Sequence, residues 1–114
     1  ERYDEAEPLF QEIIAAEEKA RGKEHQDTLV SMHWLAMLLV QQERYDEAEP
    51  LFQETIALRE KVLGKEHINT LTSVDWLVGA YEDQGKDDDA EALRQRFPAL
   101  EAFRNRPRGK AAAR

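Results

Sequence analysis

The sequence repeats itself at a fixed distance. Residues 1–12, ERYDEAEPLFQE, return letter for letter as residues 43–54, an offset of 42 residues. Residues 1–42 and residues 43–84 are identical at 26 of 42 positions, and a third, degraded copy begins at Gly85. A fixed period of this size is typical of stacked supersecondary units, none of which buries its apolar face alone. The sequence therefore predicts a tandem repeat protein.

Within each period the apolar residues recur three and four positions apart, which is the spacing of one face of a helix. Two such stripes lie in each period, so each period is a pair of helices, which pack antiparallel when the loop between them is short. Helices are expected at residues 3–21, 26–42, 45–63, 68–84 and from 87 onwards. Pro98 should end the last of these near Phe97, and residues 99–103 should form a short terminal helix that folds back as a cap.

Glycines and capping residues mark the expected helix ends. Gly22 and Gly64 should close the first and third helices, and Gly85 should make the turn after the fourth. The second helix begins near three residues able to cap it, His25, Asp27 and Thr28, and the fourth begins near Asn69 and Thr70. Pro8 should lie near the first turn of its helix, where a missing backbone donor costs little.

Four residues resemble the tetratricopeptide repeat (TPR), in which helix A carries a leucine and a tyrosine before a glycine turn, and helix B opens with an alanine. They are Leu77, Tyr81, Gly85 and Ala90. The segments EAEPLFQ and REKVLGKEH look more closely like the long repeat of kinesin light chains. This resemblance covers residues 1–97 and implies an all-α fold, a right-handed superhelical stack of about 2.5 repeats in the order B-A-B-A-B.

These features divide the chain into one repeat domain and a tail. The repeat domain is expected over residues 1–105, with a half repeat at 1–25 and full repeats at 26–67 and 68–105, the last carrying the cap. Residues 106–114 read as a disordered or tag-like tail. Because residue 1 falls within a period, we expect the chain to be excised from a longer array.

Charge and composition narrow the classes of partner. The chain has no cysteine, which fits an intracellular protein, and we expect it in the cytoplasm. Residues 1–93 carry 9 basic and 23 acidic side chains, and this acidic body argues against nucleic-acid binding. The longest purely apolar run, residues 34–40, is too short to span a bilayer. We therefore expect a protein or peptide partner, and neither nucleic acid nor a membrane.

No group of residues in the sequence predicts catalysis, a cofactor or a metal. His25 and His67 occupy the same repeat position, and their recurrence follows from the duplication. Without cysteines or a closely spaced histidine pair, loop histidines bonded to backbone are the favoured interpretation. Residues 87–89 are three aspartates in a row, which point apart on a helix and favour its N-terminus rather than an ion. The sequence therefore predicts a binding protein and not an enzyme.

The resemblance implies that the A helices line the concave side of the stack and contact a peptide or protein there. In the first full unit the corresponding positions are Val30, His33, Trp34, Met37, Val40 and Gln41. In the second they are Thr72, Asp75, Trp76, Gly79, Glu82 and Asp83. We expect an apolar anchor site in the first unit and an acidic neighbour in the second. Both tryptophans have an alternative role, packing between repeats, since a Trp ring often lies half buried.

Two further interpretations concern the ends of the array. The first helix should leave Leu9, Phe10, Ile13 and Ile14 without an A helix, which predicts a homodimer or higher oligomer through this exposed repeat end. Arrays of this kind also follow nucleotide-binding modules in fungal and bacterial signalling proteins. The alternative function is therefore a structural or sensor array that contacts its own parent chain.

Overall fold

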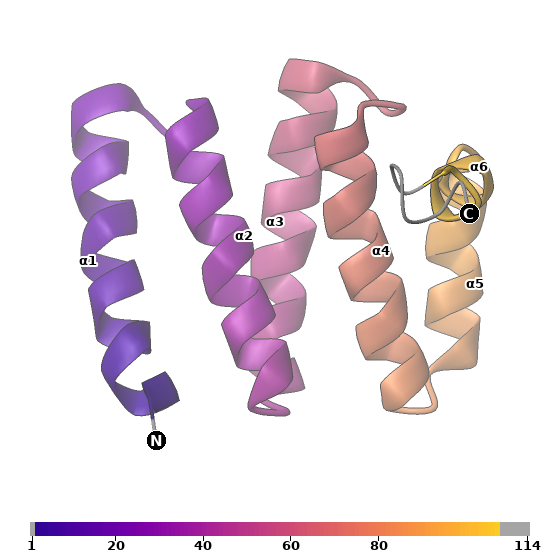
Figure 1. The fold of residues 1–114 in the computed structure, drawn as a ribbon, viewed down its shortest axis with the longest axis horizontal. Coiled ribbons are helices and arrows are strands. Elements are labelled where there is room, and N and C mark those ends of the chain that lie inside the picture. The colour runs from indigo at the N-terminus through magenta and orange to yellow at the C-terminus, as the bar shows by residue number, and fades with distance from the viewer. Residues whose placement is uncertain (1, 108–114) are drawn as a thin grey trace.

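The fold contains helices and turns only over residues 2–107, the part of the chain that the computed structural model describes. Five long helices are ranged along the longest axis in chain order, and a sixth, short helix follows (Figure 1). They are α1 (Arg2–Arg21), α2 (Gln26–Gln41), α3 (Tyr45–Leu63), α4 (Ile68–Asp83), α5 (Asp87–Arg96) and α6 (Leu100–Arg104). These bounds confirm the predicted all-α repeat fold. The tail assigned to residues 106–114 lies outside the described residues from residue 108 onwards.

A histidine of the repeat begins each A helix. His25 precedes α2 in extended conformation, and its Nδ1 accepts a hydrogen bond of 3.1 Å from the backbone N–H of Asp27. His67 does the same for α4, with a bond of 3.0 Å from the N–H of Asn69. A side chain that satisfies a free N–H group at a helix start is an N-cap. The expectation that Asn69 or Thr70 caps α4 was therefore wrong.

Glycine closes the B helices, and a positive φ angle recurs after each A helix. Gly22 and Gly64 have φ angles of 92° and 102°, and Gly85, after α4, has 76°. The position equivalent to Gly85 after α2 is Glu43, which holds a φ of 62° without being glycine. L-residues with a side chain reach this left-handed region only at a cost in free energy. The two copies therefore make the same turn, and the first makes it under strain.

The prolines differ in their effect on the helices. Pro98 follows α5 directly after its C-cap, Phe97, and so ends the helix where the sequence predicted. Pro50 lies inside α3, which begins at Tyr45, and is thus in its second turn rather than its first. Pro8 likewise lies inside α1. The expectation of a proline near the first turn was wrong, and α1 and α3 each lack one backbone hydrogen bond at the proline.

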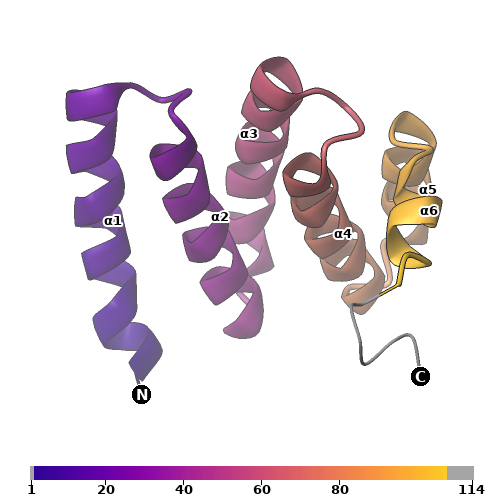
Figure 2. The same ribbon diagram turned by 45° about the horizontal axis from the view of Figure 1, so that its top comes forward.

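The B helix α3 packs against the A helices on either side of it, while α1 packs against α2 and α5 against α4. The A helices α2 and α4 lie on one side of the stack, with α3 behind and between them (Figures 1 and 2). The apolar stripe of α3 forms the centre of the core: Ala48 and Phe52 have no exposed surface, and Ile56 is 2% exposed. Residues of α2 and α4 close over it, and Leu39 and Leu77 are 4% and 1% exposed.

The C-terminal end of the stack is covered by α6. Leu100 of α6 is 2% exposed, and the side chain of Arg104 donates a hydrogen bond of 2.6 Å to Asp75 of α4. The residue equivalent to Asp75 in α2, His33, makes the corresponding contact to Ser73 of α4. Thus α6 lies beside α4 much as α4 lies beside α2, and it takes the place that a following A helix has in the array. The predicted short terminal helix is present.

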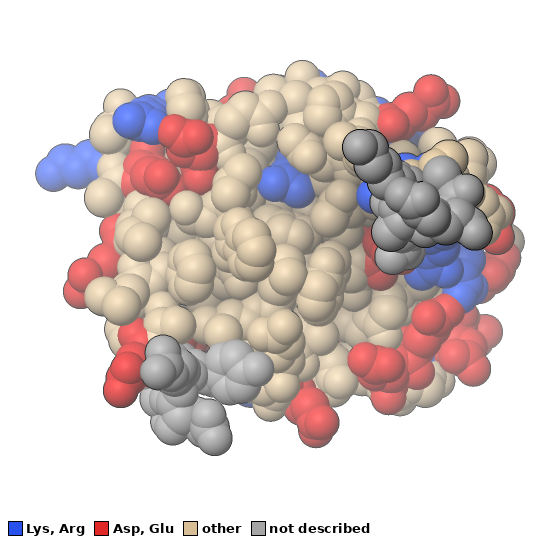
Figure 3. Space-filling view, in the orientation of Figure 1, with Lys and Arg blue, Asp and Glu red and all other residues tan. Residues whose placement is uncertain are grey.

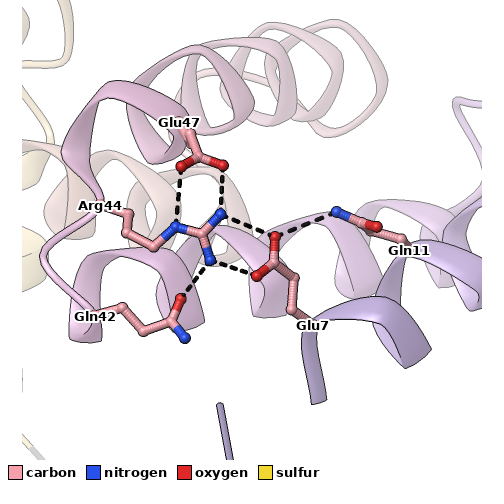
Figure 4. Close-up of polar contacts among 5 residues, drawn as sticks. All are labelled: Glu7, Gln11, Gln42, Arg44 and Glu47. Carbon is pink, nitrogen blue, oxygen red and sulfur yellow. Dashed lines mark hydrogen bonds and ion pairs between the residues drawn. The ribbon is translucent and has the colours of Figure 1, made fainter. Parts of the chain in front are cut away.

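A network of polar contacts joins the B helices of neighbouring repeats (Figure 4). Arg44, just before α3, donates to Glu47 of its own helix, to Glu7 of α1 and to Gln42. Gln11 also donates to Glu7, at 3.3 Å. Hydrogen bonds to Glu47 and then to Glu7 raise the pKa of the Arg44 guanidinium.

The same contact returns one period later. Lys86 and Glu49 occupy the positions of Arg44 and Glu7, and they form an ion pair of 3.2 Å. Gln84, equivalent to Gln42, joins this second pair by donating to Glu49 at 2.5 Å. We call the pairs Glu7–Arg44 and Glu49–Lys86 the inter-repeat ladder. It fixes the offset between one B helix and the next.

Candidate binding surface

The side of the stack formed by α2 and α4, the α2–α4 face, carries few charged side chains at its middle. Figure 3 shows this face: residues other than Lys, Arg, Asp and Glu cover most of it, and acidic side chains gather towards its edges. A surface poor in charged side chains at its centre and charged at its rim is the pattern found where proteins bind one another. All twelve residues that the sequence analysis expected to bind a partner belong to these two helices.

A hollow of about 270 Å³ opens on this face between α2, α4 and α6. It brings together five of the twelve predicted residues, one from α2 and four from α4. The lining consists of Val40, Asp75, Trp76, Gly79 and Asp83, together with Ala80 and Arg104. Trp76 is half buried and packs against the core, so one part of its ring is shared between the core and the hollow. The two predicted roles of this tryptophan are thus compatible.

The floor of the hollow exists because residue 79 is a glycine. Gly79 lies in the interior of α4, where it has an ordinary helical φ angle and needs no special backbone conformation. A Cβ atom added there meets nothing within 4 Å, so no neighbouring atom requires a glycine either. Glycine inside a helix costs about 1 kcal/mol relative to alanine. Its structural effect is to leave this space open.

Two carboxylates and one guanidinium surround the hollow. Arg104 is paired with Asp75, and this cation comes from α6, which the sequence analysis did not include among the binding residues. The exposed carboxylate of Asp83 makes no ion pair among the residues described. The hollow therefore offers an apolar wall, from Val40 and Trp76, beside one unneutralised acidic group.

His33 does not belong to this surface, and its assignment to it was wrong. Its side chain lies in the core between α2, α3 and α4, where the residue is 7% exposed and its ring meets that of Phe52 edge-on at 5.7 Å. The N–H of Arg59 donates to Ser73 Oγ at 3.0 Å, which leaves the Ser73 hydroxyl to donate to His33 Nδ1 at 2.8 Å. This chain of donors fits a neutral imidazole.

Burial, and secondly the charge of Arg59, lower the pKa of His33 from 6.5 to about 4. Arg59 is itself 4% exposed, and burial lowers the pKa of its guanidinium. It donates to the backbone carbonyl of Asn69 at 2.7 Å, but its Nε has no partner. The neutral His33 imidazole and the Arg59 guanidinium are both buried, and neither lines the hollow.

The remaining predicted residues are spread over other parts of the molecule. Trp34 and Val30 are 51% and 40% exposed on α2 but do not line the hollow. Glu82 is turned towards α5, where it pairs with Arg94. Thr72 donates its hydroxyl to the carbonyl of Ile68 at 2.7 Å. Met37 is half buried against the core and Gln41 is exposed. The expected anchor of Trp34, Met37 and Val40 is therefore not formed as one site.

A second hollow, of about 350 Å³, lies between α3, α4 and α5. Its lining includes Ala57, Ala92 and Arg96, and Gln53 donates across it to the hydroxyl of Tyr81 at 3.0 Å. This hollow is the larger of the two and serves as a comparison site.

The described residues show neither a candidate metal centre nor a helix suited to a bilayer. No cluster of three or more His, Cys, Asp or Glu side chains that could hold a metal ion occurs within residues 2–107. None of the helices in that range is both long enough and apolar enough to cross a membrane.

Paired antiparallel helices that repeat every 42 residues, and a shared face hollowed between successive A helices, define a helical-hairpin repeat protein. The family model described as the tetratricopeptide repeat matches residues 1–61 and again residues 27–96. The chain belongs to the tetratricopeptide repeat family. Repeats of this family generally mediate protein–protein interaction and are typically non-catalytic.

Solved structures agree with the kinesin light chain-like character of the repeats. The chain is similar to two crystal structures of nearly identical TPR-like repeats of a Podosopora anserina kinesin light chain, one of them a point variant. For the point variant the TM-score is 0.79 at 28% identity, over 96% of this chain and 52% of the solved one. For the other structure it is 0.78, again at 28% identity. The chain thus spans about half the length of these relatives. The comparison with curated proteins finds no match.

Proposed function

We propose that this chain binds an extended segment of a protein partner on the α2–α4 face, and that the hollow at Gly79 receives an apolar side chain of that segment. The observation that carries the proposal is Gly79 itself. A glycine that lowers helix stability, and that neither the backbone nor a neighbouring atom requires, keeps the hollow open. Open apolar space beside a half-buried tryptophan suits an anchor residue of a partner.

The charges suggest which residue accompanies the anchor. Asp83 has an exposed carboxylate at the rim, whereas Asp75 is paired with Arg104. A lysine or arginine of the partner next to the apolar anchor would pair with Asp83. An acidic residue there would be repelled by Asp83, because the charge of Asp75 is balanced by Arg104. The partner segment we propose therefore carries one large apolar residue followed or preceded by a basic one.

Peptide binding measured by fluorescence anisotropy tests this proposal. The probes are labelled extended peptides with one large apolar residue and, beside it, Lys, Gln or Glu. We expect the Lys peptides to bind best and Asp83→Asn to remove that preference. Gly79→Leu should fill the hollow while helix propensity improves, and should weaken binding about tenfold or more, which corresponds to about 1.4 kcal/mol.

The matched control is Ala57→Leu, which adds bulk to the second hollow and should leave peptide binding unchanged. Circular dichroism of both variants checks that the fold is retained. Equal binding by the Gly79→Leu protein and the parent would refute the proposed site. A loss of binding in Ala57→Leu alone would move the site to the other side of the stack.

A further inference from the structure

Two acidic residues of α4 lie one turn to either side of Gly79. Asp75, Gly79 and Asp83 are four positions apart, so they share one side of the helix and follow each other at about 6 Å along its axis. A partner segment that places its apolar anchor at Gly79 and runs along α4 therefore passes Asp83 on one side of the anchor and Asp75 on the other. Judged from α4 alone, the hollow would attract two basic residues of the partner.

The two carboxylates differ in what already neutralises them. Among the residues that the structure describes, Asp83 is exposed and makes no ion pair, whereas Asp75 accepts a hydrogen bond of 2.6 Å from Nε of Arg104. A guanidinium that bonds directly to a carboxylate balances its charge. Arg104 comes from α6, so the chain itself supplies one of the two cations that the carboxylates of α4 attract.

The packing of α6 holds Arg104 at this place. Leu100, one turn before Arg104, is 2% exposed, and Phe103 packs against the core. The helix as a whole lies against α4. Because the guanidinium belongs to the same chain and its helix is anchored, its effective concentration at Asp75 exceeds that of a lysine that arrives with a partner. A basic side chain of the partner should therefore leave the pair of Asp75 and Arg104 in place.

The first repeat shows that this pair is not common to all A helices. The residue of α2 equivalent to Asp75 is His33, which is neutral and buried and contacts Ser73 of the following A helix. Both positions thus turn towards the helix that follows, but only the second carries an acid, and only there does the following helix bring a base. The charge of the hollow therefore depends on Arg104 as much as on α4.

We propose that Arg104 is a specificity-determining residue, which occupies at Asp75 the place of a second basic residue of the partner. The inference rests on the proposed function, in which the partner's apolar anchor lies at Gly79. With Arg104 present, one basic residue beside the anchor pairs with Asp83. A second basic residue, on the other side of the anchor, gains no ion pair and meets the charge of Arg104 instead. The α2–α4 face thus favours segments with a single basic residue.

Fluorescence anisotropy with three kinds of labelled extended peptide tests the role of Arg104. Each peptide has one large apolar residue, flanked by two Gln, by one Lys and one Gln, or by two Lys. In the parent protein the first lysine should strengthen binding and the second should leave it unchanged. In Arg104→Gln the second lysine should strengthen binding by up to about fivefold, as expected of a partly exposed ion pair. Arg104→Lys keeps the charge and should behave as the parent does.

Two further variants separate the charge of Asp75 from other effects of the substitution. Adding Asp75→Asn to Arg104→Gln should abolish the gain from the second lysine, and a gain that persists would overturn the inference. Arg94→Gln is the matched control, since Arg94 of α5 pairs with Glu82 of α4 but does not line the hollow. The same gain in Arg94→Gln would assign the effect to net charge and also overturn the inference.

The peptide series also separates this inference from the proposed function. If the peptides bind but the second lysine has the same effect in the parent and in Arg104→Gln, the role of Arg104 is refuted and the proposed function stands. If no peptide binds either protein, the proposed function is refuted and the role of Arg104 with it. Circular dichroism of each variant checks that the helical content is retained.

Discussion

Phe10 and Phe52 occupy the same position of the repeat but differ in burial. Replacing each by alanine should therefore lower the free energy of unfolding by different amounts. Phe52 has no exposed surface and contacts the His33 ring at 5.7 Å. Truncating a fully buried Phe costs about 3–5 kcal/mol, because the lost transfer free energy is joined by the cost of a cavity. Phe52→Ala should therefore lower the free energy of unfolding by that amount.

Phe10→Ala should cost much less. Part of the Phe10 ring is in water already, and the space left behind opens to solvent instead of forming an enclosed cavity. Only the transfer free energy of the buried part is lost, about 1 kcal/mol, since full burial of such a side chain contributes about 1.5–3 kcal/mol. The expected difference between the two variants is thus about 2–4 kcal/mol.

Urea unfolding followed by circular dichroism measures both losses, provided that the slope of free energy against urea is the same in all three proteins. Equal losses in the two variants would refute the reasoning, because they would mean that α1 is covered as completely as α3.

Three other predictions follow from local features. Glu43→Gly should raise the free energy of unfolding by about 1 kcal/mol by relieving the positive φ angle, and a loss in urea unfolding would show that the Glu43 side chain contributes more than the strain costs. The pKa of His33 is lowered from 6.5 to about 4 in the folded protein, so the unfolded chain binds more protons than the folded protein between pH 4 and pH 6.5. The free energy of unfolding should therefore fall by up to about 3 kcal/mol as the pH drops from 6.5 to 4. That part of the loss should be absent in His33→Gln, and a ring that titrates near 6.5 by NMR would contradict it. His67→Ala should cost about 1 kcal/mol in thermal or urea unfolding through loss of the N-cap on α4, whereas an unchanged midpoint would assign no stability to the cap.

The helices were predictable from the sequence because several independent signals coincide at their ends. The repeat period, the glycines after the B helices and Pro98 after α5 all agree, and the predicted bounds differ from the observed ones by one residue or less for the first four helices. Five of the residues that line the hollow had been named because the resemblance to the tetratricopeptide repeat implies those positions on the A helices. Residues three to four positions apart on α4, such as Asp75, Gly79 and Asp83, share one side of a helix.

The parts that were not predictable depend on which neighbour each helix has. α2 is apolar nearly all round, so its sequence does not show which side turns to α4, and His33 was assigned to the surface although it lies in the core. The equivalent Asp75 lines the hollow because the neighbour of α4 is the short α6. Arg104 was missed because α6 falls after the repeats end, where no period indicates what it contacts. His25 was one of three candidate caps for α2, and the favoured interpretation of both loop histidines was a bond to backbone, but for α4 the sequence pointed to Asn69 or Thr70 instead of His67.

The inter-repeat ladder has a consequence for how such a protein can change in length. Glu7 pairs with Arg44 and Glu49 with Lys86, and in each pair the basic residue comes 37 positions after the acidic one. Insertion of one further 42-residue copy between the two repeats would give every new glutamate and every new basic residue a counterpart at the same distance along the chain. Duplication of a whole repeat would thus yield a longer array whose inter-repeat pairs are already provided, while the closing contact of α6 stays at the end. Adding or removing a whole repeat would therefore keep the contacts of the inter-repeat ladder intact.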